Sequence, residues 1–208
     1  MGVFKLIKKG WDSFVQWEEN FFETTLRLLD FFKRYRKKDS DERLIVRCKW
    51  GNLSAFDQLI QRYQIPMQEF SYFMIGEKAL DNSFSFSLFT LAFSKLKQFP
   101  LDDHFSTWMF RLTYHQCLKT LNGDENLSSC KFSLKDPILP LLGKIKMENR
   151  AVIILHDMLE IDFSDLASIF EVSPGTIRSR LHRARLDLKG LMKNQNILNV
   201  GGLETIKT

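Results

Sequence analysis

The chain has 208 residues, of which 44% are hydrophobic and 26% are charged, and its formal net charge is +5. This length allows one large domain or two small ones, and 19 phenylalanines against 10 glycines and 5 prolines favour helices over sheets. The cysteines Cys48, Cys117 and Cys130 have no paired spacing, which argues against a disulfide framework and a zinc site. No uncharged apolar run reaches the ~18 residues of a membrane span, which argues against an integral membrane protein.

The first segment, residues 1–38, is an aromatic-rich extension without the apolar stretch and cleavage site of a secretory signal, so we expect a cytoplasmic protein with reduced thiols. Its large apolar side chains recur every three or four residues, which predicts an amphipathic helix or helix pair. The apolar positions are Phe4, Ile7, Trp11, Phe14, Phe21, Leu28 and Phe32. Three interpretations stay open: packing on the rest of the chain, docking on a partner, or binding a membrane surface. Packing within the chain is the simplest of them, and we do not expect a membrane partner.

The second segment, residues 39–121, is predicted to be a helical domain. Acidic residues at positions 39–42 suit a helix N-terminus, Gly51-Asn52 ends that helix, and Ser54 is placed to cap the next. That next helix covers residues 55–63, with a bend expected at Pro66. Two more helices are expected over residues 84–99 and 107–121. A polar linker, residues 122–137, then leads to a C-terminal domain, residues 138–194, and a short tail, residues 195–208.

Residues 161–192 have the pattern of a DNA-binding helix-turn-helix, in which two helices are joined by a tight turn. Asp162 is placed to cap the first helix, over residues 163–170, and Asp165 in its first turn suits the helix dipole. The turn is Glu171-Val172. Because glycine is common where this chain has Glu171, we expect a strained or altered turn.

The second helix of this pair begins with Ser173 as its cap and Pro174 in its first position, where a missing N–H costs nothing. At about 100° per residue, its apolar and polar side chains separate onto two faces. The apolar face, toward the core, holds Ile177, Leu181, Ala184 and Leu188. The opposite face holds Thr176, Ser179, His182 and Arg183. The two edges between these faces hold Arg178, Arg180 and Arg185.

This distribution suits reading of the DNA major groove, because short polar side chains and one arginine reach base edges while flanking arginines grip phosphates. Backbone amides near Gly175, at the helix N-terminus, are placed to meet a phosphate. An ordinary surface helix with an arginine-rich face is the alternative, but the capped helix and tight turn before it favour DNA binding. The predicted DNA-binding residues are Ser173, Thr176, Arg178, Ser179, Arg180, His182, Arg183 and Arg185.

The same residues are very similar to a known family. Residues 173–185, SPGTIRSRLHRAR, resemble the signature in the fourth conserved region of the bacterial extracytoplasmic-function sigma factors, and residues 149–155 resemble the stretch upstream of it. In the second segment, Gly51-Asn52 and residues 55–64 resemble the start of the family's second region, and residues 105–112 resemble its later helix. The resemblance covers residues 40–192 in the family's order.

The resemblance implies an all-α protein with a region 2-like helical bundle and a region 4-like helix-turn-helix domain, which correspond to residues 39–121 and 138–194. It implies a factor without catalytic residues, metal or cofactor that binds core RNA polymerase and directs it to promoters. The helix-turn-helix would read the −35 element of double-stranded promoter DNA. The region 2-like bundle would dock on the polymerase clamp and help to open the −10 element. An anti-sigma factor is a candidate partner, whose existence the sequence leaves open.

Two groups of residues in the second segment take roles from this resemblance. Stacking on single-stranded −10 DNA would fall to Trp108 and Tyr114, with Arg111 beside them, although burial in the core is the alternative for Trp108. The family usually has an acidic, Gln-containing stretch on its clamp-binding helix, whereas residues 83–89 carry no charge. Apolar contacts to polymerase are therefore predicted from Phe84, Phe86, Leu88 and Phe89.

Two interpretations of the whole chain follow. The first is a sigma-like initiation factor, and the second is a divergent sigma-like regulator that binds DNA or another protein without recruiting polymerase, which the loss of acidity at residues 83–87 supports. An enzyme is not expected, because no nucleophile–base pair, Gly-rich phosphate loop or metal cluster is present in the sequence. His156-Asp157 is only a neighbouring pair on a helix, where adjacent side chains do not face each other.

Overall fold

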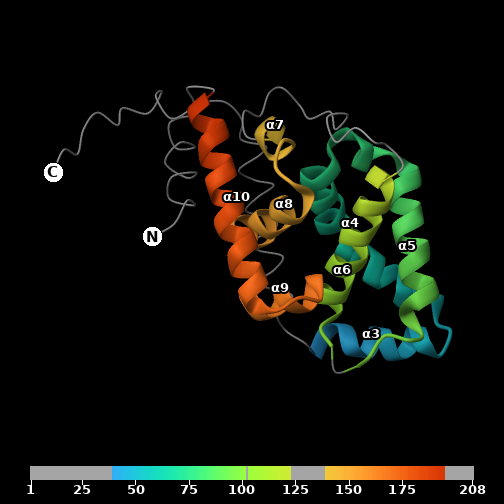
Figure 1. The fold of residues 1–208 in the computed structure, drawn as a ribbon. Coiled ribbons are helices and arrows are strands. Elements are labelled where there is room, and N and C mark those ends of the chain that lie inside the picture. Colours follow the sequence, from blue (N-terminus) through green and yellow to red (C-terminus); the bar gives the residue numbers. More distant parts are fainter. Residues whose placement is uncertain (1–38, 102, 123–138, 195–208) are drawn as a thin grey trace, which may run out of the picture.

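The computed structural model describes residues 39–101, 103–122 and 139–194, and every regular element in these ranges is a helix (Figure 1). This confirms the all-α prediction. The elements in chain order are α3 (Asp39–Lys49), α4 (Leu53–Ile75), the 3₁₀ turn η1 (Gly76–Leu80), α5 (Asn82–Leu96), α6 (Phe105–Asn122), α7 (Leu139–Leu142), α8 (Met147–Ile153), the π-helical turn η3 (Ile154–Met158), α9 (Phe163–Phe170) and α10 (Pro174–Asn194). The aromatic stripe predicted for residues 1–38 and the thiol of Cys130 lie outside the described residues.

The first group of helices, α3–α6, packs around the long helix α4, which contacts α3, α5 and α6. The start of α4 corrects the sequence prediction: Asn52, not Ser54, is the N-cap, and its side-chain oxygen accepts a hydrogen bond from the Ala55 N–H at 3.0 Å. Both residue types are good caps, and the chain uses the earlier one. The helix then continues through the buried Pro66 to Ile75, well beyond the predicted end.

The core of this first group is built largely from aromatic rings, which explains the high phenylalanine content. Tyr63 on α4 meets Phe105 on α6 edge-to-face, with ring centroids 5.1 Å apart. Phe70 and Phe110, from the same two helices, repeat this geometry at 5.3 Å. Such pairs add about 0.5–1.5 kcal/mol each beyond their area burial. The side chains of Cys48 and Cys117 are buried in this group, and burial raises the pKa of Cys48.

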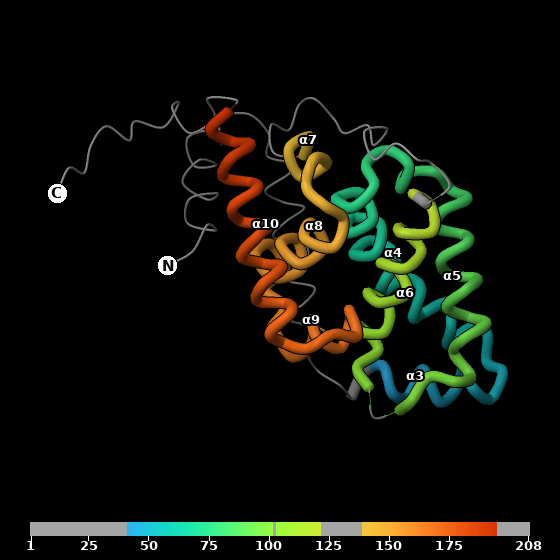
Figure 2. The backbone as a smooth tube through the Cα atoms, viewed as in Figure 1, coloured from blue at the N-terminus to red at the C-terminus, as the bar shows by residue number. Residues whose placement is uncertain are grey.

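The second group, α7–α10, lies beside the first, with α10 on the side of the molecule away from α5 (Figures 1 and 2). Arg150 of α8 joins the two groups. Its guanidinium is fully buried and donates to the carbonyl oxygen of Met74 at the end of α4, and also to the carbonyls of Gly143 and Ile145 at 2.5 and 3.0 Å. Burying a cation is costly unless its donors are paired, and these hydrogen bonds pair both terminal nitrogens, Nη1 and Nη2. No helix in the described ranges is both long enough and apolar enough to cross a membrane.

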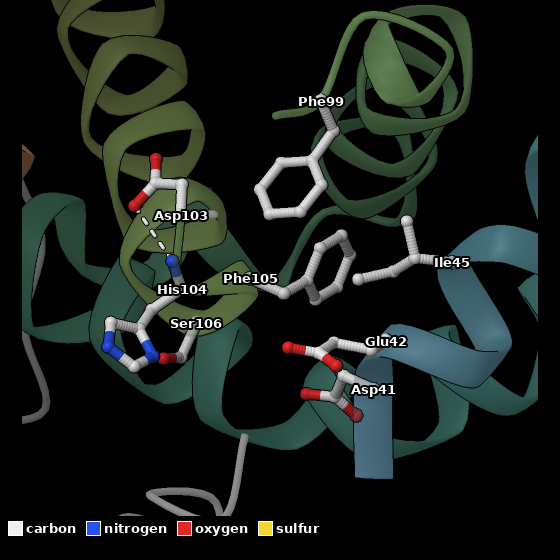
Figure 3. A pocket seen from close by; sticks show the side chains of 8 residues that line it. All are labelled: Asp41, Glu42, Ile45, Phe99, Asp103, His104, Phe105 and Ser106. Carbon is white, nitrogen blue, oxygen red and sulfur yellow. Dashed lines mark hydrogen bonds between the residues drawn. The ribbon is translucent and has the colours of Figure 1, made fainter. Parts of the chain in front are cut away.

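A small pocket lies between the start of α3 and the start of α6, where the rings of Phe99 and Phe105 face the acidic side chains of α3 (Figure 3). Both oxygens of the Asp41 carboxylate beside it accept hydrogen bonds from within the chain. Arg62 donates to one oxygen at 2.6 Å and the Tyr63 hydroxyl donates to the other. Asp103 accepts from the backbone N–H of His104 at 2.8 Å. These interactions are structural, since they fasten α3 to α4 and begin α6.

Candidate nucleic-acid interface

The helix-turn-helix forms as the sequence predicts. Asp162 caps α9 by accepting a hydrogen bond from the Asp165 N–H at 2.8 Å. After α9, Glu171 adopts the left-handed conformation, with φ +54° and ψ +41°. This region favours glycine, because a side chain there costs roughly 1 kcal/mol, so the predicted strain at this position is confirmed. Ser173 then caps α10 and accepts from the Thr176 N–H at 3.2 Å.

Helix α10 has two clearly different faces. The four residues predicted to face the core, Ile177, Leu181, Ala184 and Leu188, are all buried. They hold α10 against α8, α9 and α7. On the opposite side, the residues predicted to face outward are all exposed, and these are Thr176, Ser179, His182 and Arg183. The helix therefore presents a short polar and basic strip to solvent on a rigid support, as a groove-reading element requires.

At one edge of this strip, Arg178 is held over an aromatic ring. Its guanidinium carbon lies 5.5 Å from the centroid of Phe163, in cation–π contact. The other partner of Phe163 is His156, whose ring centroid is 4.5 Å away and whose Nδ1 lies 2.8 Å from the carbonyl oxygen of Ile161. Arg178 is exposed, so its outward donors remain turned to solvent.

At the other edge, Arg185 turns back into the protein. Its Nε and Nη2 donate to the two carboxylate oxygens of Asp157 at 2.9 and 2.5 Å. The Asp157 side chain is 3% exposed and that of Arg185 is 31% exposed. This bidentate hydrogen bonding raises the pKa of Arg185 above its usual value. Arg180, the third edge arginine, is half-buried.

Sequence reasoning had no means of finding this ion pair. Asp157 lies in the π-helical turn η3, 28 positions before Arg185, and a wheel drawn at 3.6 residues per turn does not apply there. The contact between Phe163 and Arg178 also joins two different helices. The position of Phe163 directly after the Asp162 cap was the available signal, because it places the ring at the start of the helix-turn-helix.

The three residues predicted to contact single-stranded −10 DNA lie on α6, where Trp108 and Tyr114 are buried and Arg111 is half-buried. Trp108 is 8% exposed and Tyr114 is 6% exposed. Trp108 packs on Phe99 with ring centroids 5.2 Å apart, so its ring forms part of the core in this structure. Arg111 donates through both Nε and Nη2 to the carbonyl oxygen of Ser168 on α9, at 3.0 and 2.7 Å.

The four residues predicted to contact polymerase divide into two pairs. Phe84 and Leu88 are buried and hold α5 on the core, so they offer no surface in this structure. Phe86 is 75% exposed, and Phe89 is half-buried. The exposed side of α5 thus combines the phenyl rings of Phe86 and Phe93 with serine and threonine side chains. Before Lys95 it carries no charged residue.

Comparison with known proteins matches this architecture to one family. The sequence profile of "Sigma-70, region 4" matches residues 138–188, which include the whole helix-turn-helix up to Leu188. The ECF RNA polymerase sigma factor SigW of Bacillus subtilis is 21% identical over 178 residues, covering 72% of this chain and 95% of SigW. The RNA polymerase sigma factor CnrH of Cupriavidus metallidurans is 25% identical over 183 residues, covering 74% of this chain and 95% of CnrH.

Solved structures agree with these relatives. The structure of CnrH in complex with the cytosolic domain of CnrY matches with a TM-score of 0.62 at 25% identity, covering 75% of this chain and 99% of CnrH. The sigma factor RpoE, in complex with the anti-sigma factor NepR from Bartonella quintana, shares the fold with a TM-score of 0.53 at 22% identity. The chain is therefore similar to extracytoplasmic-function sigma factors in both sequence and fold, in agreement with the resemblance of residues 40–192.

Proposed function

We propose that this chain is a sigma-like transcription initiation factor that binds core RNA polymerase and directs it to promoters. The observation that carries the proposal is the exposed face of α10. Ser179, His182 and Arg183 point to solvent from a helix whose opposite side is anchored in the core. A recognition helix of this kind presents its side chains to base edges while the surrounding cations contact the backbone.

In this proposal the residues of α10 divide into three roles. Arg183 and the short side chains beside it contact base edges of the −35 element, because one arginine can address a guanine with two hydrogen bonds. Arg178, supported by Phe163, contacts a phosphate at the groove edge. Arg185 differs from the sequence prediction, because its donors are committed to Asp157. We assign it to positioning α10 rather than to gripping DNA.

The polymerase contact is proposed for the exposed side of α5, through Phe86 and the half-buried Phe89. A face with two exposed aromatic rings, Phe86 and Phe93, and no charge before Lys95 suits a mostly apolar partner surface. Because promoter DNA and polymerase lie in the bacterial cytoplasm, we place the protein there.

Two relatives in the solved structures are bound to CnrY and to the anti-sigma factor NepR. By analogy, we propose that an anti-sigma factor also binds this chain.

The proposal is tested by transcription in vitro. Core RNA polymerase from the chain's own host is mixed with the full-length protein and with fragments of that host's genome. We expect discrete transcripts that depend on the protein and that disappear in the double variant Ser179→Ala, Arg183→Ala. The matched control is Lys193→Ala, which removes a positive charge near the C-terminal end of the same helix. Transcripts that are identical with and without the protein would refute an initiation role, and DNA binding without transcription would favour a regulator that does not recruit polymerase.

A further inference from the structure

The turn between α3 and α4 presents the most exposed large apolar side chain of the described residues. Trp50 is 87% exposed, and Leu53, at the start of α4, is 63% exposed. The backbone of this turn is well fixed. The N–H of Trp50 donates to the carbonyl oxygen of Val46 at 3.2 Å, and the next two N–H groups also donate to α3, at 2.9 and 3.0 Å. Gly51 closes the turn with a left-handed φ of +85°.

Trp50 continues an exposed face of α3 that also carries two arginines. The side chains of Arg43, Val46, Arg47 and Trp50 are all exposed. Because they stand at positions i, i+3, i+4 and i+7, a helix of about 100° per residue places them within about 100° of one another. The opposite side of α3 is buried against α4 and α5. The helix therefore offers solvent one continuous strip that combines guanidinium groups with an indole ring.

The charge of this part of the chain is strongly positive. Residues 33–50 contain eight lysines and arginines and three acidic residues, so their net charge of +5 equals that of the whole chain. Two of these acids lie away from the exposed strip. Asp41 is paired with Arg62 of α4 at 2.6 Å, and Glu42 lines the pocket between α3 and α6 (Figure 3). The strip is therefore complementary to a polyanion.

An exposed ring beside cations is the combination that single-stranded nucleic acids select. Any unpaired base can stack on an aromatic face, while arginines contact the phosphates that flank it. The paired bases of a duplex are stacked on one another, so the same ring would add little to duplex binding. The stacking residues predicted from the sequence, Trp108 and Tyr114, are buried, whereas Trp50 is available.

We propose that the exposed strip of α3 binds single-stranded DNA, with Trp50 stacked on one base and Arg43 and Arg47 on neighbouring phosphates. The inference deepens the proposed function and rests on it for the ligand, since opened promoter DNA is the single strand that an initiation factor meets. The strip is separate from the recognition helix: α3 lies at the lower edge of the molecule and α10 runs along its left side (Figure 1). It holds a strand without reading its sequence.

The stacking contact is tested with the full chain and a labelled single-stranded oligothymidylate, whose binding is followed by fluorescence anisotropy. Trp50→Ala should weaken strand affinity on the order of 10-fold, because the stacking of one base is lost. Trp50→Tyr keeps an aromatic ring and should retain most of the affinity. The matched control is Phe86→Ala, which removes an exposed ring from α5 and should have no effect on strand binding.

The phosphate contacts are tested by the salt dependence of the same binding. The double variant Arg43→Ala, Arg47→Ala should reduce the slope of log affinity against log salt by about 1.4, since each single-strand phosphate contact contributes about 0.7. Its control is Lys95→Ala, Lys97→Ala, which removes the same charge from exposed positions at the end of α5. Trp50→Ala should leave duplex affinity unchanged, and thermal unfolding checks that each variant folds.

The strand site on α3 is refuted if Trp50→Ala and the arginine double variant bind the oligonucleotide as their controls do. Equal losses in Trp50→Tyr and Trp50→Ala would also refute it, because stacking would then contribute nothing. Binding to phosphatidylglycerol vesicles that needs Trp50, without strand binding, would make the strip a lipid site instead.

These outcomes are separable from failure of the proposed function. Strand binding that depends on Trp50, in a protein that never supports transcription, would refute only the initiation role. Protein-dependent transcription together with undiminished strand binding by Trp50→Ala would refute only the site on α3.

Discussion

Asp157 and Arg185 form a bidentate ion pair that fastens the recognition helix α10 to the π-helical turn η3. The carboxylate is almost completely buried, so the guanidinium supplies the charge that makes its burial tolerable. Because Arg185 lies near the middle of α10, the pair also fixes the rotation of this helix about its axis. That rotation decides which side chains, Ser179 and Arg183 among them, are presented to DNA.

The first prediction concerns stability. Arg185→Ala should lower the free energy of unfolding by about 3 kcal/mol, because it leaves the Asp157 carboxylate buried without a partner. Arg183→Ala removes the same side chain from an exposed position on the same helix and should change that free energy by less than about 0.5 kcal/mol. Urea unfolding of both variants measures the difference. Equal losses would mean that the Asp157 pair contributes no net stability.

The second prediction concerns DNA binding by the Arg183→Ala variant. Arg183→Ala should weaken binding to the preferred sequence by about 1–3 kcal/mol if its guanidinium contacts a base edge. Its binding to random duplex should change much less. Titrations of both duplexes at matched salt separate the cases. An equal loss on specific and random DNA would instead make Arg183 a phosphate contact.

The third prediction concerns α5. Phe86→Ser should weaken the complex with core polymerase by about 1–2 kcal/mol while leaving the free energy of unfolding unchanged, since this ring is exposed and contributes little to the core. Phe84→Ser, two positions earlier, places a hydroxyl in the core and should destabilise the fold instead. Leu186→Ser, an exposed apolar residue on α10, is the control for nonspecific loss of apolar surface. Undiminished polymerase binding by Phe86→Ser would remove α5 as the contact.

The fourth prediction is a pH dependence. Burial raises the pKa of Tyr114 from 10.0 to about 12, so the folded protein favours the neutral phenol. The stability from this burial is complete below pH 10 and is lost as the pH rises from 10 through 12. Relative to Tyr114→Phe, which has no ionisable group there, the wild-type protein should lose stability over this interval. Parallel curves for the two proteins would show that Tyr114 is not enclosed between α6 and α9.

The local features of the helix-turn-helix were predictable because short-range rules determine them. Each cap, Asp162 and Ser173, needs only a side-chain oxygen that accepts a hydrogen bond from the backbone N–H three residues later. The division of α10 into a buried and an exposed face requires only helical periodicity. Even the unusual conformation of Glu171 was visible as a missing glycine. None of these features depends on a distant part of the chain.

The remaining features depend on contacts between distant segments, which periodicity does not contain. Tyr114 and Trp108 are aromatic residues on a helix with more than one covered side, so the sequence could not say which neighbour would cover them. Arg185 was assigned to phosphate binding from its position on the edge of α10. Its actual partner, Asp157, lies in a π-helical turn 28 positions earlier, where helical periodicity does not reveal it. The cap at Asn52 was missed by two residues, because Asn and Ser are equivalent caps and helix ends shift easily.

Co-purification with core RNA polymerase is the most direct measurement of whether this chain acts in initiation. The full-length protein and its host's core enzyme are mixed at low salt and separated by size. We predict that the protein elutes with the enzyme and that Phe86→Ser reduces the bound fraction. If the protein elutes alone even at low salt, it does not recruit polymerase, and its exposed recognition helix serves a regulator of another kind.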